Sequence, residues 1–411
     1  MPNSHLDVEI DSHAYGGEAL GRAPDGRRVF ARGALPGERV RMQVTEERPS
    51  YLRGRVTEVL RAAETRVTPR CAHFGECGGC HYQHMHHTAQ LAAKSEVLRE
   101  QLRRLGGISA PPIETTLASS AEWNYRNHVQ FSLTLDGRPG YMRQGSRQVM
   151  AIRECHLPEP LLNGIWPALD LHEAQGLTQV GLRSGGDGEA MIVLEGSEVE
   201  APEVETESAL SVAWLGPSGQ AQVLTGEGSL HFAVSGTDFE VSPGSFFQIN
   251  TQLVPTLVEQ VMALAEVKPG ETVLDVYSGV GLFSAFLASQ AGRVVAVEAS
   301  PSSAADFEIN LDAFDNVELY EATAEEVLPH LEVEAHAVVI DPPRAGVERE
   351  AMAGLLRLAP RRIVYVSCDP STLARDGREL HAAGYSLAAL VPIDLFPQTF
   401  HIESISLWRA E

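Results

Sequence analysis

Cys368 and Glu403 are the residues of this 411-residue chain whose types and settings point most directly to chemistry. Cys368 follows the apolar run 363–366 within Val-Ser-Cys-Asp-Pro, so we expect it at the end of a strand. Glu403 ends the segment 396–403, between two apolar stretches, and we expect it on a nearby loop. A thiolate can act as a nucleophile and a carboxylate as a general base. Such a pair could add to a pyrimidine ring and later remove a proton from it.

A glycine turn after an apolar strand predicts a cofactor site. Residues 273–281 read Val-Leu-Asp-Val-Tyr-Ser-Gly-Val-Gly, a strand that runs into a turn and then a helix. Glycine lets a ligand approach the backbone at the carboxyl end of a strand. Glu298 ends the next strand, 294–297, where an acid can accept hydrogen bonds from both hydroxyls of a ribose. This segment resembles S-adenosylmethionine-dependent methyltransferases; the competing interpretation is an ordinary βαβ turn with a surface glutamate.

Three of the five cysteines lie close together, which indicates a metal site. Cys71, Cys77 and Cys80 are separated by five and two residues, and Cys155 could be a fourth ligand. Five cysteines in a chain of this length do not form a disulfide framework. Four thiolates suit an iron–sulfur cluster or a zinc ion, and the residues alone leave both open. Three nearby histidines could substitute as ligands: His73, His81 and His84.

Three further motifs resemble those of the RNA uracil-C5 methyltransferases, which make 5-methyluridine in ribosomal or transfer RNA. They are Asp-Pro-Pro-Arg-Ala-Gly at 341–346, Val-Tyr-Val-Ser-Cys-Asp-Pro at 364–370 and Ile-Asp-Leu-Phe-Pro-Gln-Thr-Phe-His-Ile-Glu at 393–403. The resemblance extends over nearly the full chain. Its N-terminal segment is similar to the family's TRAM domain, and residues 71–80 are similar to the iron–sulfur motif typical of the ribosomal RNA branch.

The resemblance implies a role for each candidate residue. Cys368 would add to C6 of uracil, and Glu403 would remove the C5 proton after a methyl group has been transferred to C5. S-adenosylmethionine would be bound by four residues: Gln248, Tyr277, Glu298 and Asp341. A [4Fe–4S] cluster, with zinc as the alternative, would be held by four others: Cys71, Cys77, Cys80 and Cys155. The substrate would be 23S ribosomal RNA; the alternatives are transfer RNA, or a non-catalytic iron–sulfur protein that binds RNA.

The elements that must position these residues divide into three expected domains. Residues 1–64 read as short strands and turns, which predicts an OB-like TRAM barrel that binds RNA. Residues 65–235 read as a β-rich central domain with the cysteine motif, including a helix at about 85–110 that would pack on the catalytic domain. Residues 236–411 alternate apolar strands with helices, so we expect an α/β, Rossmann-like methyltransferase domain.

Charge and hydropathy limit which partners and which cellular location we expect. The net charge is −23, but residues 1–110 carry +3 and the remainder −26, so RNA contact should lean on the N-terminal part. Near the target base, residues 125–128 and Phe246 could contact RNA, with ordinary packing as the alternative. The chain shows neither an apolar run of membrane-spanning length nor a secretion signal. We therefore expect a cytoplasmic protein without membrane contact, and we infer no obligate protein partner.

Overall fold

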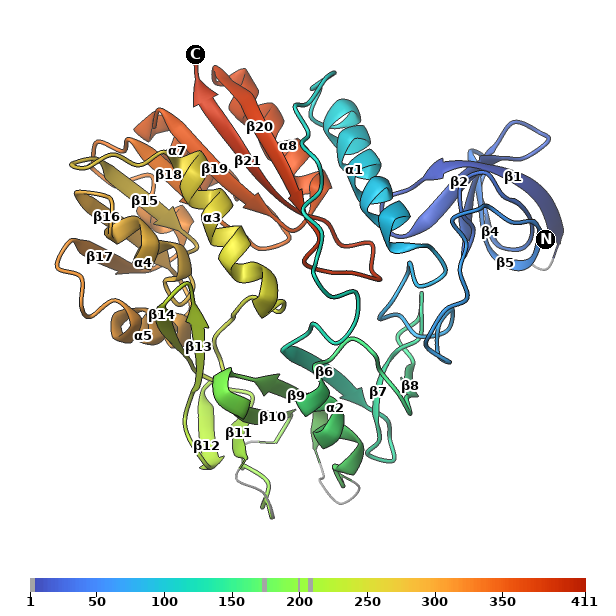
Figure 1. Cartoon of the computed structure of the whole chain (residues 1–411), viewed down its shortest axis with the longest axis horizontal. Coiled ribbons are helices and arrows are strands. Elements are labelled where there is room, and N and C mark those ends of the chain that lie inside the picture. Colours follow the sequence, from blue (N-terminus) through green and yellow to red (C-terminus); the bar gives the residue numbers. More distant parts are fainter. Residues whose placement is uncertain (1–3, 172–175, 199, 206–209) are drawn as a thin grey trace.

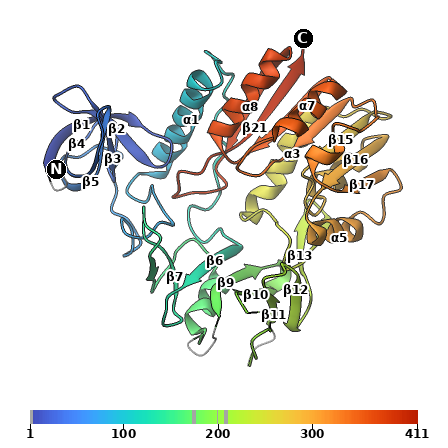
Figure 2. The same ribbon diagram turned by 180° about the vertical axis from the view of Figure 1, so that it is seen from behind.

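The computed structural model describes residues 4–171, 176–198, 200–205 and 210–411, which form a barrel, two seven-stranded sheets and a hairpin. The barrel lies at one end of the molecule, and helix α1 (His87–Arg104) lies between the barrel and the C-terminal sheet (Figure 1). The view from behind shows the same order, with the central sheet at the foot of the molecule (Figure 2). No helix of the described part is long and apolar enough to cross a membrane.

The N-terminal strands close into a five-stranded barrel, as the sequence predicts. Its strands are β1 (His5–His13), β2 (Glu18–Arg22), β3 (Arg28–Arg32), β4 (Arg39–Glu47) and β5 (Tyr51–Arg61), hydrogen-bonded in the order β1-β2-β3-β5-β4. Alternate residues of the strands point inward and form an apolar core, among them Val29, Val40 and Met42. Closure leaves the outward faces of the strands for polar side chains.

The central sheet is β-rich and largely antiparallel. Its order is β12-β11-β10-β9-β6-β7-β8, and only β10 and β11 run parallel. The strands are β6 (His128–Leu133), β7 (Pro139–Met142), β8 (Val149–Ala151), β9 (Leu177–Ser184), β10 (Ala190–Gly196), β11 (Ser211–Leu215) and β12 (Ala221–Thr225). Short helices accompany them: α2 (Pro160–Ile165), η1 (Trp166–Ala168) and η2 (Gly186–Gly188).

A hairpin joins the central sheet to the C-terminal part. Strands β13 (Leu230–Val234) and β14 (Thr237–Val241) pair with each other, and the predicted boundary between residues 235 and 236 falls in their turn. The hairpin residues Phe232 and Phe239 pack into the same core as helix α3 (Val254–Ala265), which follows η3 (Thr251–Leu253). The hairpin therefore packs with the C-terminal part, and the three domain limits stay predictions.

The C-terminal sheet has the order β17-β16-β15-β18-β19-β21-β20, with five parallel strands and an antiparallel strand β21. The strands are β15 (Thr272–Val276), β16 (Arg293–Glu298), β17 (Val317–Glu321), β18 (Ala337–Ile340), β19 (Arg362–Ser367), β20 (Tyr385–Ile393) and β21 (Glu403–Ala410). The helices are α4 (Leu282–Ala288), α5 (Pro301–Asn310), α6 (Ala324–Val327), α7 (Arg349–Leu358) and α8 (Pro370–Ala382). This is the doubly wound α/β architecture that the alternating sequence pattern predicts.

Helices cover both faces of this sheet, which explains why its strands are apolar at successive positions. Val273 and Val364 face the core shared with α3 and α4. Leu274 and Ile363 face the opposite core, which α7, α8 and α1 complete. Helix α1 belongs to the segment before the central sheet, yet its apolar side chains pack on α8 of the C-terminal part.

Candidate active site

Strand pairing brings Cys368 and Glu403 together. Cys368 directly follows β19, and Glu403 is the first residue of β21 rather than a loop residue as the sequence suggested. The antiparallel register pairs Ser367 with Ser404. One step further along this register, Cys368 lies opposite Glu403. Parallel strands end at one edge of the sheet, and an antiparallel neighbour begins there. The thiol and the carboxylate therefore meet at the edge where the strands β15, β18 and β19 end.

Carboxylates and one arginine surround the thiol. Burial, Glu403 and Asp341 raise the pKa of Cys368 to about 12, and Arg344 opposes this shift. Glu403 is 4% exposed, and burial together with the charge of Asp341 raises its pKa well above the usual range. Burial and Asp275 likewise raise the pKa of Asp341 to about 7. The buried carboxyl groups of Glu403 and Asp341 hold a proton more tightly than they would in water. Each carboxylate is therefore a stronger base once it is ionised.

The predicted cofactor turn lies at the same edge of the sheet. Tyr277 follows β15 with φ of 65°, a left-handed conformation that is uncommon for a residue with a side chain. Glu298, at the end of β16, accepts hydrogen bonds from the backbone N–H of Gly279 (2.8 Å) and Ser300 (2.7 Å). These bonds fix the carboxylate against the turn. Tyr277, Glu298 and Asp341 thus lie at the ends of three adjacent strands, β15, β16 and β18.

Asp275 is a buried carboxylate at this edge that is not among the predicted site residues. It is 0% exposed, and its Oδ2 accepts a hydrogen bond from Ser284 (2.7 Å). Its Oδ1 has no hydrogen-bond partner among the described residues. Burial raises the pKa of Asp275 to about 7. The signal for it was present in the sequence, because an acid within an apolar strand has to be stabilised by a partner or a ligand.

Gln248 comes from outside the sheet and is held by the central domain. It lies in the loop between β14 and η3, where its carbonyl accepts a hydrogen bond from the Asn127 side chain (3.1 Å). The backbone N–H of Asn127 donates to Ile249 (3.0 Å) in the same loop. The neighbouring Phe246 is 60% exposed, so its ring is accessible for stacking. These contacts tie the Gln248 loop to the start of β6.

The N-terminal barrel contributes Tyr15 to the candidate active site, which no sequence pattern revealed. Tyr15 lies between β1 and β2, and its hydroxyl donates a 2.6 Å hydrogen bond to Asp369, the residue after Cys368. Its ring also makes an edge-on contact with Phe400, at 5.7 Å between centroids. Asp369 in turn caps α8 by accepting from the N–H groups of Ser371 and Thr372. A residue 354 positions away in the chain thus supports the segment that carries the thiol.

The four predicted metal ligands line a single cavity. Its walls include the side chains of Cys71, Cys77, Cys80 and Cys155, together with Arg126 and Tyr141. Backbone N–H groups of His73 and Gly79 point at the sulfurs of Cys71 and Cys77, both at 3.4 Å. Burial raises the pKa of Cys77 to about 11 and that of Cys80 to about 12. Within the described residues, no three His, Cys, Asp or Glu side chains are grouped closely enough to hold a single metal ion.

The alternative histidines and one suggested RNA contact have other environments. His73 also lines the cysteine cavity, where its Nε2 accepts a hydrogen bond from the backbone of Arg153 (3.0 Å). His84 packs against Phe74, and His81 against Phe400. Tyr125 is fully buried and donates to the carbonyl of Pro397 (2.9 Å). Ordinary packing, the alternative considered for Tyr125, is therefore its role.

Comparison with known proteins identifies the family. Residues 227–410 match the tRNA (uracil-5-)-methyltransferase family, and residues 1–57 match the TRAM domain. An uncharacterised RNA methyltransferase of Aquifex aeolicus is 34% identical over 99% of both chains. Another, from Caldanaerobacter subterraneus, is 32% identical over 98% of this chain and 97% of its own. The chain belongs to the RNA uracil-C5 methyltransferase family and is an S-adenosylmethionine-dependent RNA methyltransferase.

A solved structure has the same fold throughout. The tRNA (uracil-54, C5)-methyltransferase of Pyrococcus abyssi, determined in complex with S-adenosyl-L-homocysteine, superimposes with a TM-score of 0.73. The match covers 98% of this chain and 100% of that protein, at 23% identity. The barrel, the central part and the Rossmann-like domain are therefore one shared arrangement. Family membership argues against the non-catalytic alternative considered for the sequence.

Proposed function

We propose that this chain methylates C5 of uracil in 23S ribosomal RNA through a covalent bond between Cys368 and C6 of the ring. The observation that carries the proposal is the register of β19 and β21, which places Cys368 opposite Glu403 at the carboxyl edge of the sheet. A target uridine has to leave its surroundings to reach this edge, because Cys368 is only partly accessible.

The residues at this edge fit S-adenosylmethionine. Glu298 would accept from the ribose hydroxyls, and Tyr277, Asp341 and Gln248 would complete the site. The unpartnered Oδ1 of buried Asp275 supports a ligand here, since buried polar atoms are normally hydrogen-bonded. When bound, the cofactor supplies an electrophilic methyl group on a positively charged sulfur. The surrounding carboxylates favour a positive charge at this edge.

Cys368 and Glu403 would act in sequence on the ring. The Cys368 sulfur, once it has lost its proton, bonds to C6 and makes C5 nucleophilic, so that C5 takes up the methyl group. The carboxylate of Glu403 then removes the C5 proton, and the electron pair released expels the Cys368 thiolate. Arg344 favours the thiolate form of Cys368. Burial raises the pKa of Glu403, so its carboxylate, once ionised, is a stronger base than a solvated one.

Cys71, Cys77, Cys80 and Cys155 would hold a [4Fe–4S] cluster, with zinc as the alternative. Their shared cavity and the N–H groups aimed at two of the sulfurs support a site for thiolate ligands. A zinc ion needs its sulfurs about 2.3 Å from one centre, whereas a cluster separates its ligands more widely. Within the described residues the thiols are not grouped closely enough for one ion, so the cluster is proposed first. We also propose a cytoplasmic location for the protein. The proposed domain limits lie near residues 64 and 235.

Transfer RNA is the second candidate substrate, favoured by the description of the matching family as tRNA (uracil-5-)-methyltransferases. The test is to incubate unmodified 23S ribosomal RNA and transfer RNA separately with the enzyme and methyl-labelled cofactor, and then to map 5-methyluridine. We expect label at uridine C5 in 23S RNA. Label in transfer RNA alone would replace the proposed substrate, and label on another atom would reject the chemistry.

Cys368→Ala tests the covalent step. This variant should bind S-adenosylhomocysteine as the wild type does, yet form neither 5-methyluridine nor a covalent RNA adduct. Full activity of Cys368→Ala would overturn the mechanism but leave the methyltransferase assignment intact.

A further inference from the structure

Helix α1 carries a buried lysine that the proposed chemistry does not use. Lys94 is 2% exposed and is one of only two lysines in the chain. Its Nζ donates to Asp394 Oδ1 (2.6 Å) and to the carbonyl of Phe396 (2.9 Å). Both acceptors belong to the loop of residues 394–402, which connects β20 to β21 and ends directly before Glu403. We call this segment the 394–402 loop.

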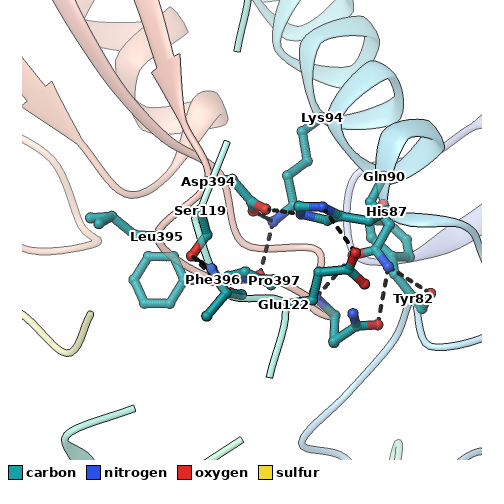
Figure 3. A network of polar contacts seen from close by, with 12 residues as sticks. Tyr82, His87, Gln90, Lys94, Ser119, Glu122, Asp394, Leu395, Phe396 and Pro397 are labelled. Atoms are coloured by element: carbon teal, nitrogen blue, oxygen red, sulfur yellow. Dashed lines mark hydrogen bonds and ion pairs between the residues drawn. The ribbon is translucent and has the colours of Figure 1, made fainter. Parts of the chain in front are cut away.

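Asp394 has a second partner on the same helix. Figure 3 shows Lys94 and His87 directed at its carboxylate from α1. His87 Nε2 lies 2.8 Å from Asp394 Oδ2, and its other ring nitrogen lies 3.6 Å from Glu122. Replacing a buried ion pair by apolar side chains is often neutral for stability. A role in orienting the loop therefore accounts for this pair better than a contribution to stability does.

Gln90, one turn before Lys94 on α1, holds the middle of the same loop. Gln90 and Gln398 exchange two hydrogen bonds: the Gln398 backbone N–H donates to Gln90 Oε1 (2.9 Å), and Gln90 Nε2 donates to Gln398 Oε1 (3.0 Å). The Gln398 carbonyl also accepts from the backbone N–H groups of His81 (2.9 Å) and Tyr82 (3.0 Å). Gln398 is 2% exposed and has φ of 68°. Such a conformation persists only where surrounding contacts enforce it.

These contacts converge on the residue that follows the loop. Lys94 fixes the start of the 394–402 loop, Gln90 fixes its middle, and the first residue after it is Glu403. A carboxylate that acts as a base has to lie within hydrogen-bond reach of the proton it removes. Small displacements of catalytic groups lower rates by orders of magnitude. The orientation of the loop thus decides where the Glu403 carboxylate lies relative to the ring bonded to Cys368.

We propose that Lys94 and Gln90 are positioning residues that clamp the 394–402 loop onto α1 and so hold Glu403 for removal of the C5 proton. This inference rests on the proposed function. It assigns to α1 a role in one step of the reaction, after methyl transfer and before release of the RNA. The two N–H donors at His81 and Tyr82 follow Cys80 directly, so the cysteine segment is part of the same clamp.

The test is Lys94→Met, which keeps the length of the side chain and removes its charge. Misplacement of Glu403 should slow release after methylation, so the covalent RNA adduct should accumulate while formation of free 5-methyluridine falls at least about tenfold. Adducts are measured by denaturing electrophoresis with methyl-labelled cofactor. The matched control is Lys268→Met at the exposed second lysine, which should behave as the wild type.

Two outcomes would overturn the proposal. One is normal turnover by Lys94→Met; the other is a loss of turnover without adduct in a variant that still binds S-adenosylhomocysteine and melts as the wild type does. Wild-type enzyme that forms neither adduct nor 5-methyluridine would instead reject the proposed function. If Lys94→Met does not fold, the same assay applies to Gln90→Glu, which keeps the acceptor for Gln398 N–H and loses the donor. The double variant Lys94→Met/Asp394→Asn should lose less activity than the sum of the losses in Lys94→Met and in Asp394→Asn. The reason is that the double variant leaves no unpaired buried charge.

Discussion

Cys368 and Glu403 face each other across two antiparallel strands, one at the end of β19 and the other at the start of β21. They are 35 positions apart in the chain, and helix α8, strand β20 and the 394–402 loop lie between them. Burial, Glu403 and Asp341 together raise the pKa of the Cys368 thiol.

Glu403→Gln should separate methyl transfer from release. The amide cannot remove the C5 proton, so methylated RNA should remain bonded to Cys368, and release of 5-methyluridine should fall by a factor on the order of 100 or more. The measurement is the ratio of covalent adduct to free product with labelled cofactor. Glu379→Gln, at an exposed position of α8, is the matched control. Rapid product release by Glu403→Gln would show that another group is the base.

Tyr15→Phe should lower the catalytic rate although Tyr15 belongs to the barrel. The variant loses the 2.6 Å hydrogen bond to Asp369 and keeps the ring against Phe400. A hydrogen bond to a charged group contributes about 1.5–3 kcal/mol, and a loss of about 1.4 kcal/mol in the transition state is tenfold in rate. We expect kcat to fall roughly tenfold while the Kd for RNA stays unchanged.

Tyr51→Phe is the matched control for Tyr15, since its hydroxyl donates to Glu46 within the barrel, away from Cys368. A drop in RNA affinity with unchanged kcat in Tyr15→Phe would place Tyr15 in RNA binding instead of in support of the thiol segment.

Asp275 should make the stability of the ligand-free protein decrease as the pH rises. Burial raises its pKa to about 7, above the usual value near 4, so the protonated form is favoured in the folded state. The contribution of Asp275 to the free energy of unfolding is fully present below about pH 4 and is lost as the pH rises through 7. The change is on the order of 4 kcal/mol. Asp275→Asn should therefore flatten the dependence of unfolding free energy on pH between 4 and 7.

The measurement is urea unfolding at several pH values, with Asp238→Asn at an exposed carboxylate as control. An unchanged slope in Asp275→Asn would show that Asp275 is ionised in the folded protein at neutral pH.

Cys155→Ala should abolish binding at the proposed metal centre. If Cys155 is a cluster ligand, protein purified without oxygen should lose iron, acid-labile sulfide and visible absorption relative to the wild type. Cys368→Ala is the matched control, because the same substitution outside the cysteine cavity should leave the iron content unchanged. Stoichiometric zinc without sulfide in the wild type would establish the zinc alternative, and equal metal content in both variants would exclude Cys155 as a ligand.

The sequence by itself determined the class of fold and predicted which groups are reactive. The apolar runs with intervening helices predicted the doubly wound sheet, because strands buried on both faces need apolar residues at successive positions. The short strands and turns of residues 1–64 predicted the barrel. Local motifs around Cys368, Asp341 and Glu298 marked the strand ends, since turn residues and prolines limit the backbone there.

Only the tertiary structure decided which groups meet. Glu403 was expected on a loop, but strand pairing makes it the first residue of β21 and brings it opposite Cys368. Tyr15, Gln90 and Lys94 carry no motif, and they act on residues about 300 or more positions away. Contacts between such distant residues depend on how helices and domains pack, and a local pattern of residue types contains no record of that packing.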